Sequence, residues 1–296
     1  MIRRLFWQAV GLGLAAIALC VAIAVVRVGP IDVRGLASRP PARSAMMLER
    51  EREAHEQKRY YQESWHWVPL ERISATLRRA VLVAEDDKFF THDGLDWDEI
   101  RISAQRNLRA HKIVRGGSTI TQQLAKNLWL GSSRTPWRKI EELILAMRLE
   151  RDLTKRRILE LYLNTIEWGE GIYGVDAAAR YWFGTGATSL DANQSIRLAA
   201  VIINPRVFSP VTPSDRIENR IKMIAERLRR RGAISEDQYR VTLGLPPEAP
   251  APAIDSTLIS RPETTPAPAE ETSPPPAAPA PGVPDTAAAD TSIILR

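Results

Sequence analysis

The sequence predicts a mainly α-helical protein behind one N-terminal transmembrane helix. Between residues 65 and 244, apolar residues recur mostly at helical spacing, few runs alternate as strands do, and glycine-rich loops separate the segments. An uncharged stretch of 22 residues, 5–26, precedes this region. The chain has 296 residues, 44% of them hydrophobic, which is enough to bury a sizeable core and excludes a wholly disordered protein.

The N-terminal stretch has the length and composition of a membrane anchor. As a helix, residues 5–26 would span about 33 Å, close to the thickness of a bilayer core. A cleaved signal peptide is the alternative, because Ala22-Ile23-Ala24 resembles a cleavage site, but such peptides have apolar cores of only about 7–15 residues. We therefore predict a cytoplasmic stub and transmembrane anchor over residues 1–28. Arginines flank both ends of the span, so charge alone does not fix its orientation.

Two further segments differ in composition from the helical region. Residues 29–62 contain Pro40-Pro41 and a heavily charged run, 49–59, so we expect a stalk with a solvated helix. Residues 246–296 hold 13 of the chain's 21 prolines and too few apolar residues to offset the entropy of ordering. We predict a disordered Pro/Ala-rich tail that acts as a spacer, with a partner-binding proline motif as the alternative. The folded domain is then expected over residues 63–245.

The charge of the chain is basic but unevenly distributed. The net charge of +6 combines −4 over residues 249–296, which hold six acidic residues and two arginines, with +10 over residues 1–248. A body this basic favours a polyanionic partner: nucleic acid, an anionic membrane surface or a phosphorylated substrate. The single cysteine, Cys20, lies within the apolar stretch, which excludes an intramolecular disulfide and a cysteine-based metal site.

The first polar stretch, residues 84–94, follows an apolar run at 80–84 and begins with the acids Glu85 and Asp86. A carboxylate at the end of a buried element can have a raised pKa and act as a base. The alternative is a helix C-terminus or a turn whose acids are solvated.

The second polar stretch, residues 115–128, combines two glycines with a helix that we expect to follow Ser118 as its N-cap and to run to Leu130. One stripe of this helix is apolar and should be buried: Ile120, Leu124 and Leu128. Another carries hydrogen-bonding groups and ends in a cation: Thr119, Gln122, Gln123 and Lys126. Near a helix N-terminus such a stripe suits a phosphate or sugar ligand, and an ordinary solvated face is the alternative.

The third stretch, residues 138–150, places two basic residues one helical turn before an acid. Arg138 and Glu142 are spaced i,i+4, and Lys139 and Glu142 are spaced i,i+3, so one carboxylate can position two cations. As surface pairs they would contribute only about 0.3–0.5 kcal/mol each. A fourth stretch, residues 155–164 with a glycine-rich loop at 168–175, is expected to be mostly scaffold.

Taken in order, these stretches resemble the conserved blocks of the family 51 glycosyltransferases, the peptidoglycan transglycosylases that polymerise lipid II. The blocks are E-D-x-x-F-x-x-H-x-G at 85–94, G-G-S-T-I-T-Q-Q-L-x-K-N at 116–127, R-K-x-x-E at 138–142, R-I-L-E-x-Y-L-N at 157–164 and A-A-x-x-x-N-P at 199–205. Together they cover roughly residues 65–230. The transpeptidase signatures Ser-x-x-Lys and Lys-Thr-Gly are absent, so the chain resembles the monofunctional biosynthetic enzymes. The tail departs from their layout.

The resemblance implies a lysozyme-like larger lobe and a smaller lobe against the membrane, which suits the basic amphipathic segment at 97–115. It implies that Glu85 is the general base, which takes the proton from the 4-hydroxyl of the acceptor sugar in a single inverting displacement. A β-1,4 bond forms and undecaprenyl pyrophosphate leaves, with Lys126, Arg138 and Lys139 as the cations for its charge. Glu142, the second catalytic residue, would orient these cations or a divalent ion, or act as a second acid.

By the same motif positions, the substrate-binding residues are expected to be Asp86, Phe89, His92, Ser118, Thr119, Gln122, Gln123, Lys126, Asn127, Arg138 and Lys139. The chemistry requires no cofactor, and a divalent cation, Mg²⁺ or Mn²⁺, at Glu142 stays open. Expected partners are lipid II, the nascent glycan strand, the membrane and proteins of cell wall synthesis or division, and not nucleic acid. The expected location is the bacterial plasma (inner) membrane, as a single-pass protein. The catalytic domain is expected on the periplasmic side, because the substrate implied by the resemblance is polymerised there.

Three other classes of protein fit part of the pattern. A muramidase or lytic transglycosylase would also pair a glutamate with a lysozyme-like fold, but it does not need the cluster of Lys126, Arg138 and Lys139. A non-enzymatic membrane scaffold could lose its acids, yet Glu85 and Glu142 are both present. A nucleic-acid binder would explain the basic body, but the sequence has no recognition motif.

Overall fold

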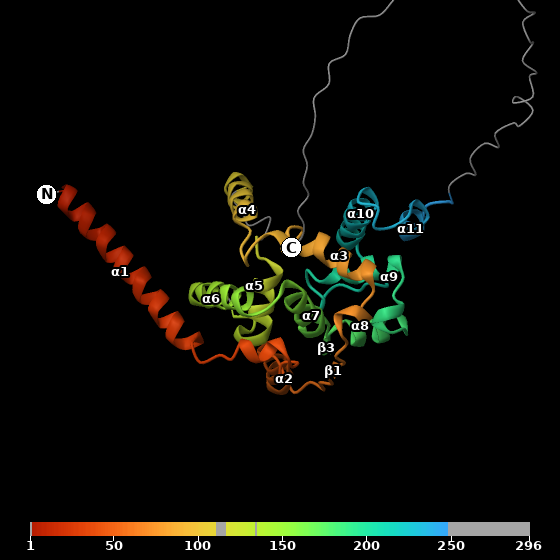
Figure 1. Ribbon diagram of the computed structural model, residues 1–296, viewed down its shortest axis with the longest axis horizontal. Helices are drawn as coiled ribbons and strands as arrows, with labels where there is room; N and C mark the ends of the chain where they lie inside the picture. The colour runs from red at the N-terminus through yellow and green to blue at the C-terminus, as the bar shows by residue number, and fades with distance from the viewer. Residues whose placement is uncertain (1, 111–116, 134, 248–296) are drawn as a thin grey trace, which may run out of the picture. The chain divides into compact units, whose positions relative to one another are not determined.

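The computed structural model describes residues 2–110, 117–133 and 135–247, and these are mainly α-helical, as predicted (Figure 1). The α-helices are α1 (Ile2–Val28), α2 (Ala45–Glu56), α3 (Ala75–Glu85), α4 (Trp97–Ala110), α5 (Ile120–Ala125), α6 (Pro136–Asp152), α7 (Lys155–Thr165), α8 (Val175–Phe183), α9 (Ala192–Val201), α10 (Asp215–Arg230) and α11 (Glu236–Thr242). The strands are β1 (Ser64–Trp65), β2 (Glu167–Gly169) and β3 (Ile172–Tyr173). Short 3₁₀ turns are η1 (Arg34–Ala37), η2 (Leu70–Arg72), η3 (Phe89–Thr91) and η5 (Ala187–Ser189), and η4 (Lys126–Leu130) is a π-helix.

The core is built from two groups of helices that meet at α3 and α5. In one group, α5, α6 and α8 pack against α7, whose Ile158, Leu161 and Leu163 are fully buried. In the other, α3 packs against α9, and both contact α10. The small sheet has the order β1-β3-β2, with β1 parallel and β2 antiparallel to β3. Burial of the apolar faces stabilises this arrangement and fixes where α3 ends and α5 begins.

The start of α5 differs in detail from the prediction. Thr119, and not Ser118, is its N-cap: the Thr119 hydroxyl accepts from the backbone N–H of Gln122 at 3.3 Å, and the Gln122 side chain accepts from the Thr119 N–H at 3.0 Å. This reciprocal capping box satisfies two donors at the helix start. The helix runs to Leu130, as predicted, but its type changes: α5 ends at Ala125 and the wider π-turn η4 continues from Lys126 to Leu130.

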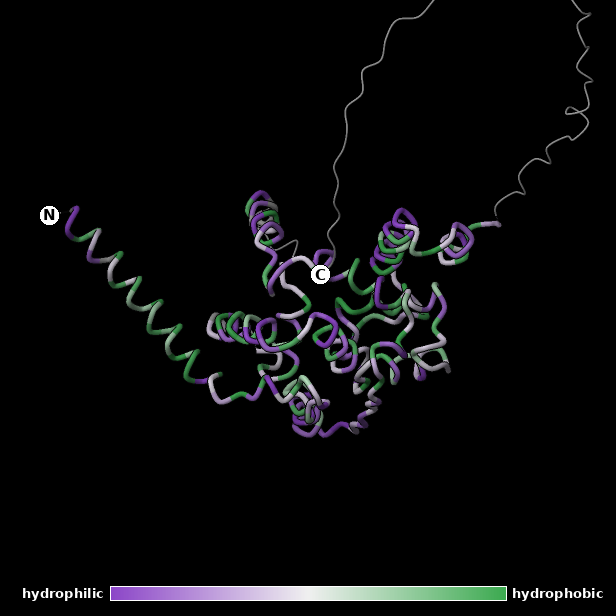
Figure 2. Tube along the Cα trace, in the orientation of Figure 1, coloured by the Kyte–Doolittle hydropathy of each residue, from purple (hydrophilic) through white to green (hydrophobic). Residues whose placement is uncertain are grey.

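Helix α1 is long and apolar enough to cross a membrane. Within Arg3–Val28, the most apolar 18-residue window has a mean hydropathy of 2.8, and Figure 2 shows hydrophobic residues along most of the helix. Its C-terminal end is attached to α6: the Arg148 guanidinium donates to the carbonyl oxygens of Val28 and Ile31, and Arg27 pairs with Glu141 at 3.1 Å. These contacts attach the C-terminal end of α1 to the part of the chain that contains α6.

Helix α2 corrects the prediction of a solvated stalk over residues 29–62. Met46, Met47 and Ala54 are buried, and α2 packs against η4. Its charged residues find partners in the body, since Arg50 pairs with Glu167 at 3.2 Å. The density of charge suggested full solvation, but one face of the helix is apolar and several of the charges form ion pairs.

Two of the predicted segments lie largely or partly outside the described residues. The predicted tail, 246–296, is outside them from residue 248 onward. The basic amphipathic segment at 97–115 is described as α4 up to residue 110, and residues 111–116 are outside. Within α4, Trp97 and Leu108 are exposed, with 71% and 75% of their surfaces accessible.

Candidate active site

Two adjoining cavities lie along α5 and share Gln123, Lys126, Ile202 and Ile203 in their walls. The first, with a volume of about 580 Å³, is the Glu85 cavity, and its charged lining residues are Glu85, Asp86, Asp87, Asp96, Glu99, Lys88, Lys126, Arg220 and Arg227. The second, of about 340 Å³, is the Glu167 cavity, and its charged lining residues are Glu167, Arg50, Lys126, Arg138 and Arg206. Both volumes are in the range of small-ligand sites.

Glu85 is the last residue of α3, whose apolar side anchors it in the core. The side chain is 13% exposed, and its Oε2 accepts from Gln123 Nε2 at 3.0 Å while its Oε1 pairs with Arg220. Burial raises the pKa of the Glu85 carboxyl above its usual range, and Arg220, Gln123 and Lys126 oppose this rise in part. A carboxyl of this kind holds a proton more readily than a solvated one, which is what a general base requires.

Sequence reasoning missed two residues that determine how Glu85 is held. Tyr162, buried in α7, donates its hydroxyl to Gln123 Oε1 at 2.9 Å, so the Gln123 amide must present its N–H₂ to Glu85. Arg220, from α10, pairs with Glu85 and also donates to the Ala84 carbonyl at 3.3 Å. Tyr162 lies in a stretch interpreted as scaffold, and Arg220 carried no local signal because its partner is 135 residues away.

Several of the predicted substrate-binding residues make contacts within the turn behind Glu85. The Asp86 carboxylate contacts His92 Nε2 at 2.9 Å and accepts from the backbone N–H of Ile120 at 2.9 Å, which ties the end of α3 to the start of α5. Thr119 donates to the Gly94 carbonyl at 2.7 Å. Phe89 is fully buried, with Lys155 Nζ 4.4 Å from its ring centroid. Among the described residues, Phe89, His92 and Gln122 do not line either cavity.

The cation cluster on α6 has the arrangement that its spacing predicted. Glu142 is buried, accepts from Arg138 Nη1 at 2.8 Å and pairs through its other oxygen with Lys139. Lys139 Nζ also donates to Ser118 Oγ at 3.1 Å, so the cluster reaches the wall of the Glu85 cavity. Arg138 lines the Glu167 cavity, as does Asn127, whose side chain donates to the Gln123 carbonyl at 2.8 Å.

Lys126 joins the two cavities and is a desolvated cation. Burial lowers the pKa of its ammonium group, with Arg138 and Lys139 acting in the same direction and Glu142 and Glu85 opposing them. Within the described residues its side chain makes no hydrogen bond or ion pair. An anionic ligand between the cavities would therefore be attracted to Lys126 and would offset the cost of its burial.

The described residues do not fit a divalent cation at Glu142. Both of its carboxylate oxygens are occupied by cationic side chains, and no group of three or more histidine, cysteine, aspartate or glutamate side chains suited to a metal occurs in the described part of the chain. The arrangement can supply a proton acceptor at Glu85 and positive charge at Lys126 and Arg138.

Comparison with known proteins gives one family and close relatives. The family model described as Transglycosylase matches residues 51–229, which include the end of α2 and nearly all of α10. Proteins named biosynthetic peptidoglycan transglycosylase are similar in Chromobacterium violaceum (48% identity over 162 residues, 55% of this chain and 71% of the relative) and Methylobacillus flagellatus (50% over 163 residues, 55% and 71%). The one from Bordetella pertussis is 42% identical over 231 residues, 77% of this chain and 96% of the relative.

Proposed function

The chain belongs to the transglycosylase family, and on that premise we propose that it polymerises lipid II into β-1,4-linked glycan strands with release of undecaprenyl pyrophosphate. It is a glycosyltransferase of peptidoglycan synthesis, as its named relatives are. The observation that carries the finer proposal is the position of Glu85. Its buried carboxyl has a raised pKa and lines a cavity that also contains Lys126. Lys126 in turn lines the adjoining Glu167 cavity, where most of the charged residues are cations.

The proposed reaction is a single displacement at the anomeric carbon of the donor. The 4-hydroxyl oxygen of the acceptor sugar forms the new bond, its proton passes to the Glu85 carboxylate, and the bond from the anomeric carbon to the phosphate oxygen breaks. The pyrophosphate leaves with the electron pair. Because nucleophile and leaving group lie on opposite sides of the reacting ring, the configuration is inverted.

We propose that the cations of the site stabilise the negative charge of the leaving pyrophosphate. Lys126 and Arg138 line the Glu167 cavity, and Lys139 lies next to them through Glu142. Fixed cations in a partly desolvated site stabilise developing negative charge without reorganising. Glu142 has both oxygens paired, so its proposed role is to hold Arg138 and Lys139, and no step is assigned to it as a second acid.

We place the substrate contacts at the residues that line the cavities. Ser118, Thr119, Gln123, Lys126, Asn127 and Arg138 do so directly. The proposed roles of Phe89, His92 and Gln122 are to shape the turn and the start of α5, and Asp86 lines the Glu85 cavity with its carboxylate already held by His92 and Ile120.

The membrane arrangement is part of the same proposal. We propose that α1 anchors the protein in the bacterial inner membrane as a single-pass helix with the cavities on the outer side, where the lipid-linked sugar is polymerised. The exposed Trp97 and Leu108 of α4, with Arg101 and Arg109 beside them, suit contact with lipid headgroups.

The proposal is tested with the purified full-length protein in liposomes that contain lipid II. Glycan strands of increasing length and release of undecaprenyl pyrophosphate are expected, and cross-linked peptides are not, because the chain lacks transpeptidase signatures. A glycan-cleaving enzyme is the competing function. Shortening of preformed strands, without growth from lipid II, would establish that function instead.

A further inference from the structure

A buried carboxylate oxygen without a partner lies in the wall of the Glu167 cavity. Glu167 is the first residue of β2, and its side chain is 8% exposed. Its Oε2 accepts from Arg50 Nε at 3.2 Å, whereas its Oε1 is buried and has no hydrogen-bond partner among the described residues. A buried acceptor left unpaired costs free energy, so an isolated one in a cavity wall indicates a position for a ligand donor.

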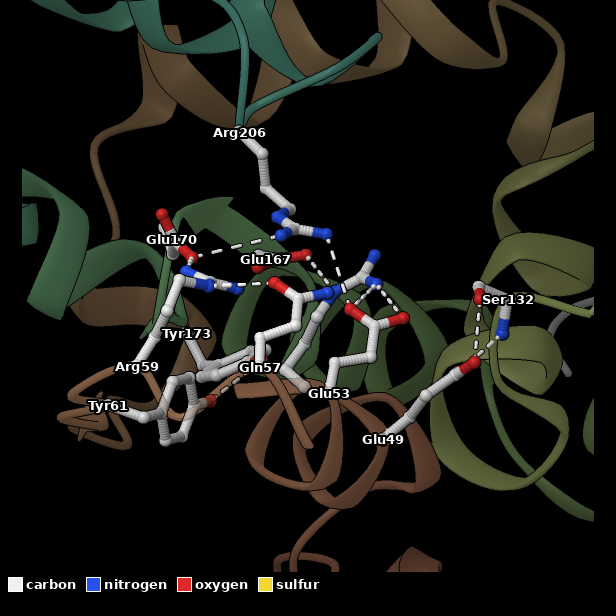
Figure 3. A network of polar contacts seen from close by, with 11 residues as sticks. Glu49, Glu53, Gln57, Arg59, Tyr61, Ser132, Glu167, Glu170, Tyr173 and Arg206 are labelled. Atoms are coloured by element: carbon white, nitrogen blue, oxygen red, sulfur yellow. Dashed lines mark hydrogen bonds and ion pairs between the residues drawn. The ribbon is translucent and has the colours of Figure 1, made fainter. Parts of the chain in front are cut away.

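The surrounding network fixes this carboxylate from one side. Arg50 is itself held by Glu53, through contacts of 3.1 and 2.9 Å from Nη1. Arg206 contacts Glu53 at 3.5 Å (Figure 3). Figure 3 also shows Glu170, whose partners are Arg59 and Arg206. The Glu167 carboxylate is therefore oriented by α2 through Arg50, and Oε1 is the oxygen that has no partner among the described residues.

The charges of the cavity restrict the kind of ligand. Arg50, Lys126, Arg138 and Arg206 line it and favour an anion, while Glu167 is the one acid among its described lining residues. Burial raises the pKa of the Glu167 carboxyl, and Arg50 opposes that rise. A ligand that satisfies both features carries negative charge for the cations and, next to it, an uncharged O–H or N–H for Glu167. A saccharide linked to a pyrophosphate has both.

We infer that Glu167 binds the saccharide of the substrate, with Oε1 accepting a hydrogen bond from a sugar hydroxyl or an amide N–H, and that Arg50 positions it. The inference rests on the proposed function and adds a substrate-binding residue to it. It also gives α2, which precedes most of the matched region, a role in the site.

The variant Glu167→Gln tests this contact without changing the shape of the side chain. Arg50 donates at Oε2, so the amide oxygen of Gln must take that position, and the N–H₂ then replaces the acceptor at Oε1. When the substrate binds, the N–H₂ of the introduced Gln and the O–H or N–H of the saccharide would face each other as two donors. The expected result is a KM for lipid II raised by about 10- to 100-fold, with kcat at saturation close to that of the parent protein.

Glu170→Gln is the matched control, because it removes the same charge three residues away on a side chain that does not line the cavity. Its KM should stay within about twofold of the parent value. Midpoints of thermal unfolding for both variants separate a binding effect from loss of folding. An unchanged KM in a folded Glu167→Gln protein would overturn the inference.

Substrate analogues that each lack one hydroxyl or amide N–H identify the donor and keep the test valid if Glu167→Gln is destabilised. One analogue should bind the parent protein about tenfold more weakly than intact lipid II binds it. The Glu167→Gln protein should bind that analogue and intact lipid II with equal affinity. If no analogue shows such coupling, the contact does not exist. Failure of the parent protein to polymerise lipid II would instead reject the proposed function itself.

Discussion

The two cavities on either side of Lys126 use charged residues in opposite ways. In the Glu85 cavity five acids accompany four cations among the described lining residues, and the proposed base is a carboxyl whose pKa burial raises. In the Glu167 cavity four cations accompany one acid. A site that transfers a proton and expels a phosphate needs both environments close together but separate, since a cation too near the base would lower its pKa.

The two glutamates predicted as catalytic show the same contrast within one site. Glu85 is paired with Arg220 and Gln123 in an arrangement where burial still dominates its pKa. Glu142 has a cation on each oxygen, one of them Arg138 at 2.8 Å. The two buried carboxylates therefore differ in their partners: Glu85 has one cation and one amide, whereas Glu142 has two cations.

The largest effect is expected where the proton acceptor is removed. Glu85→Gln keeps the shape of the side chain but cannot accept a proton, so the rate of lipid II polymerisation should fall by about 10²- to 10⁴-fold. The unfolding midpoint should change little. Near-normal turnover by the folded variant would show that the base is another residue. The Glu85 cavity would then not be the place where the proton is accepted.

The next largest effect is expected at the residue that the cavities share. Lys126→Ala removes a desolvated cation that has no side-chain partner among the described residues, so KM for lipid II and the Kd of a donor-mimicking phosphoglycolipid should both rise by about 10- to 100-fold. Lys222→Ala, which removes an exposed lysine of α10, is the control. Equal affinities for the two variants would place the phosphate elsewhere.

A smaller effect, of known sign, is expected at the partner of the base. Arg220 lowers the pKa of Glu85 against the effect of burial, so Arg220→Met should raise that pKa further. Because Glu85 acts deprotonated, the acidic limb of kcat/KM should move to higher pH by about one pH unit, a roughly tenfold loss below the limb. Arg227→Met, which lines the same cavity but contacts the Val83 carbonyl, should leave the limb in place. A limb that did not move in Arg220→Met would mean that the rate reports another group.

The smallest effect is expected outside both cavities. Deletion of residues 250–296 should leave polymerisation of lipid II unchanged, because the segment is rich in proline and alanine and lies beyond the matched region, 51–229. Rates in liposomes and in detergent check this. A loss in both media would show that the tail supports the active domain.

The sequence was sufficient for the features that depend on local spacing. Helical periodicity predicted the mainly α fold, and the i,i+3 and i,i+4 spacings predicted that Arg138 and Lys139 would meet Glu142. The N-cap of α5 was misplaced by one residue, because Ser118 and Thr119 are both good caps and only the Gln122 contact distinguishes them.

The features that depend on tertiary contacts could not be predicted in the same way. Arg50 and Glu167 are 117 residues apart, and nothing in the charged run around Arg50 distinguishes it from a solvated surface. The pairing of Glu85 with Arg220 could not be predicted for the same reason, because these residues are 135 positions apart. Sequence reasoning therefore supplied the residues that we propose for the chemistry, and the structure adds the partners that hold them.

The π-turn η4 has a consequence for how this segment can change in evolution. The Gly131 N–H bonds to the Lys126 carbonyl at 3.0 Å, five residues back, while Ser132 is held by Glu49 of α2 through its backbone N–H and hydroxyl at 2.6 and 2.7 Å. Gly131 has a φ of 67°, and a Cβ there would lie 2.4 Å from Glu49 Oε2. Loss of one residue would restore an α-turn and rotate Lys126 by about 100° relative to Ser132. Insertions and deletions between 126 and 132 would therefore displace Lys126 from the site, whereas a change of side chain that keeps the length would not.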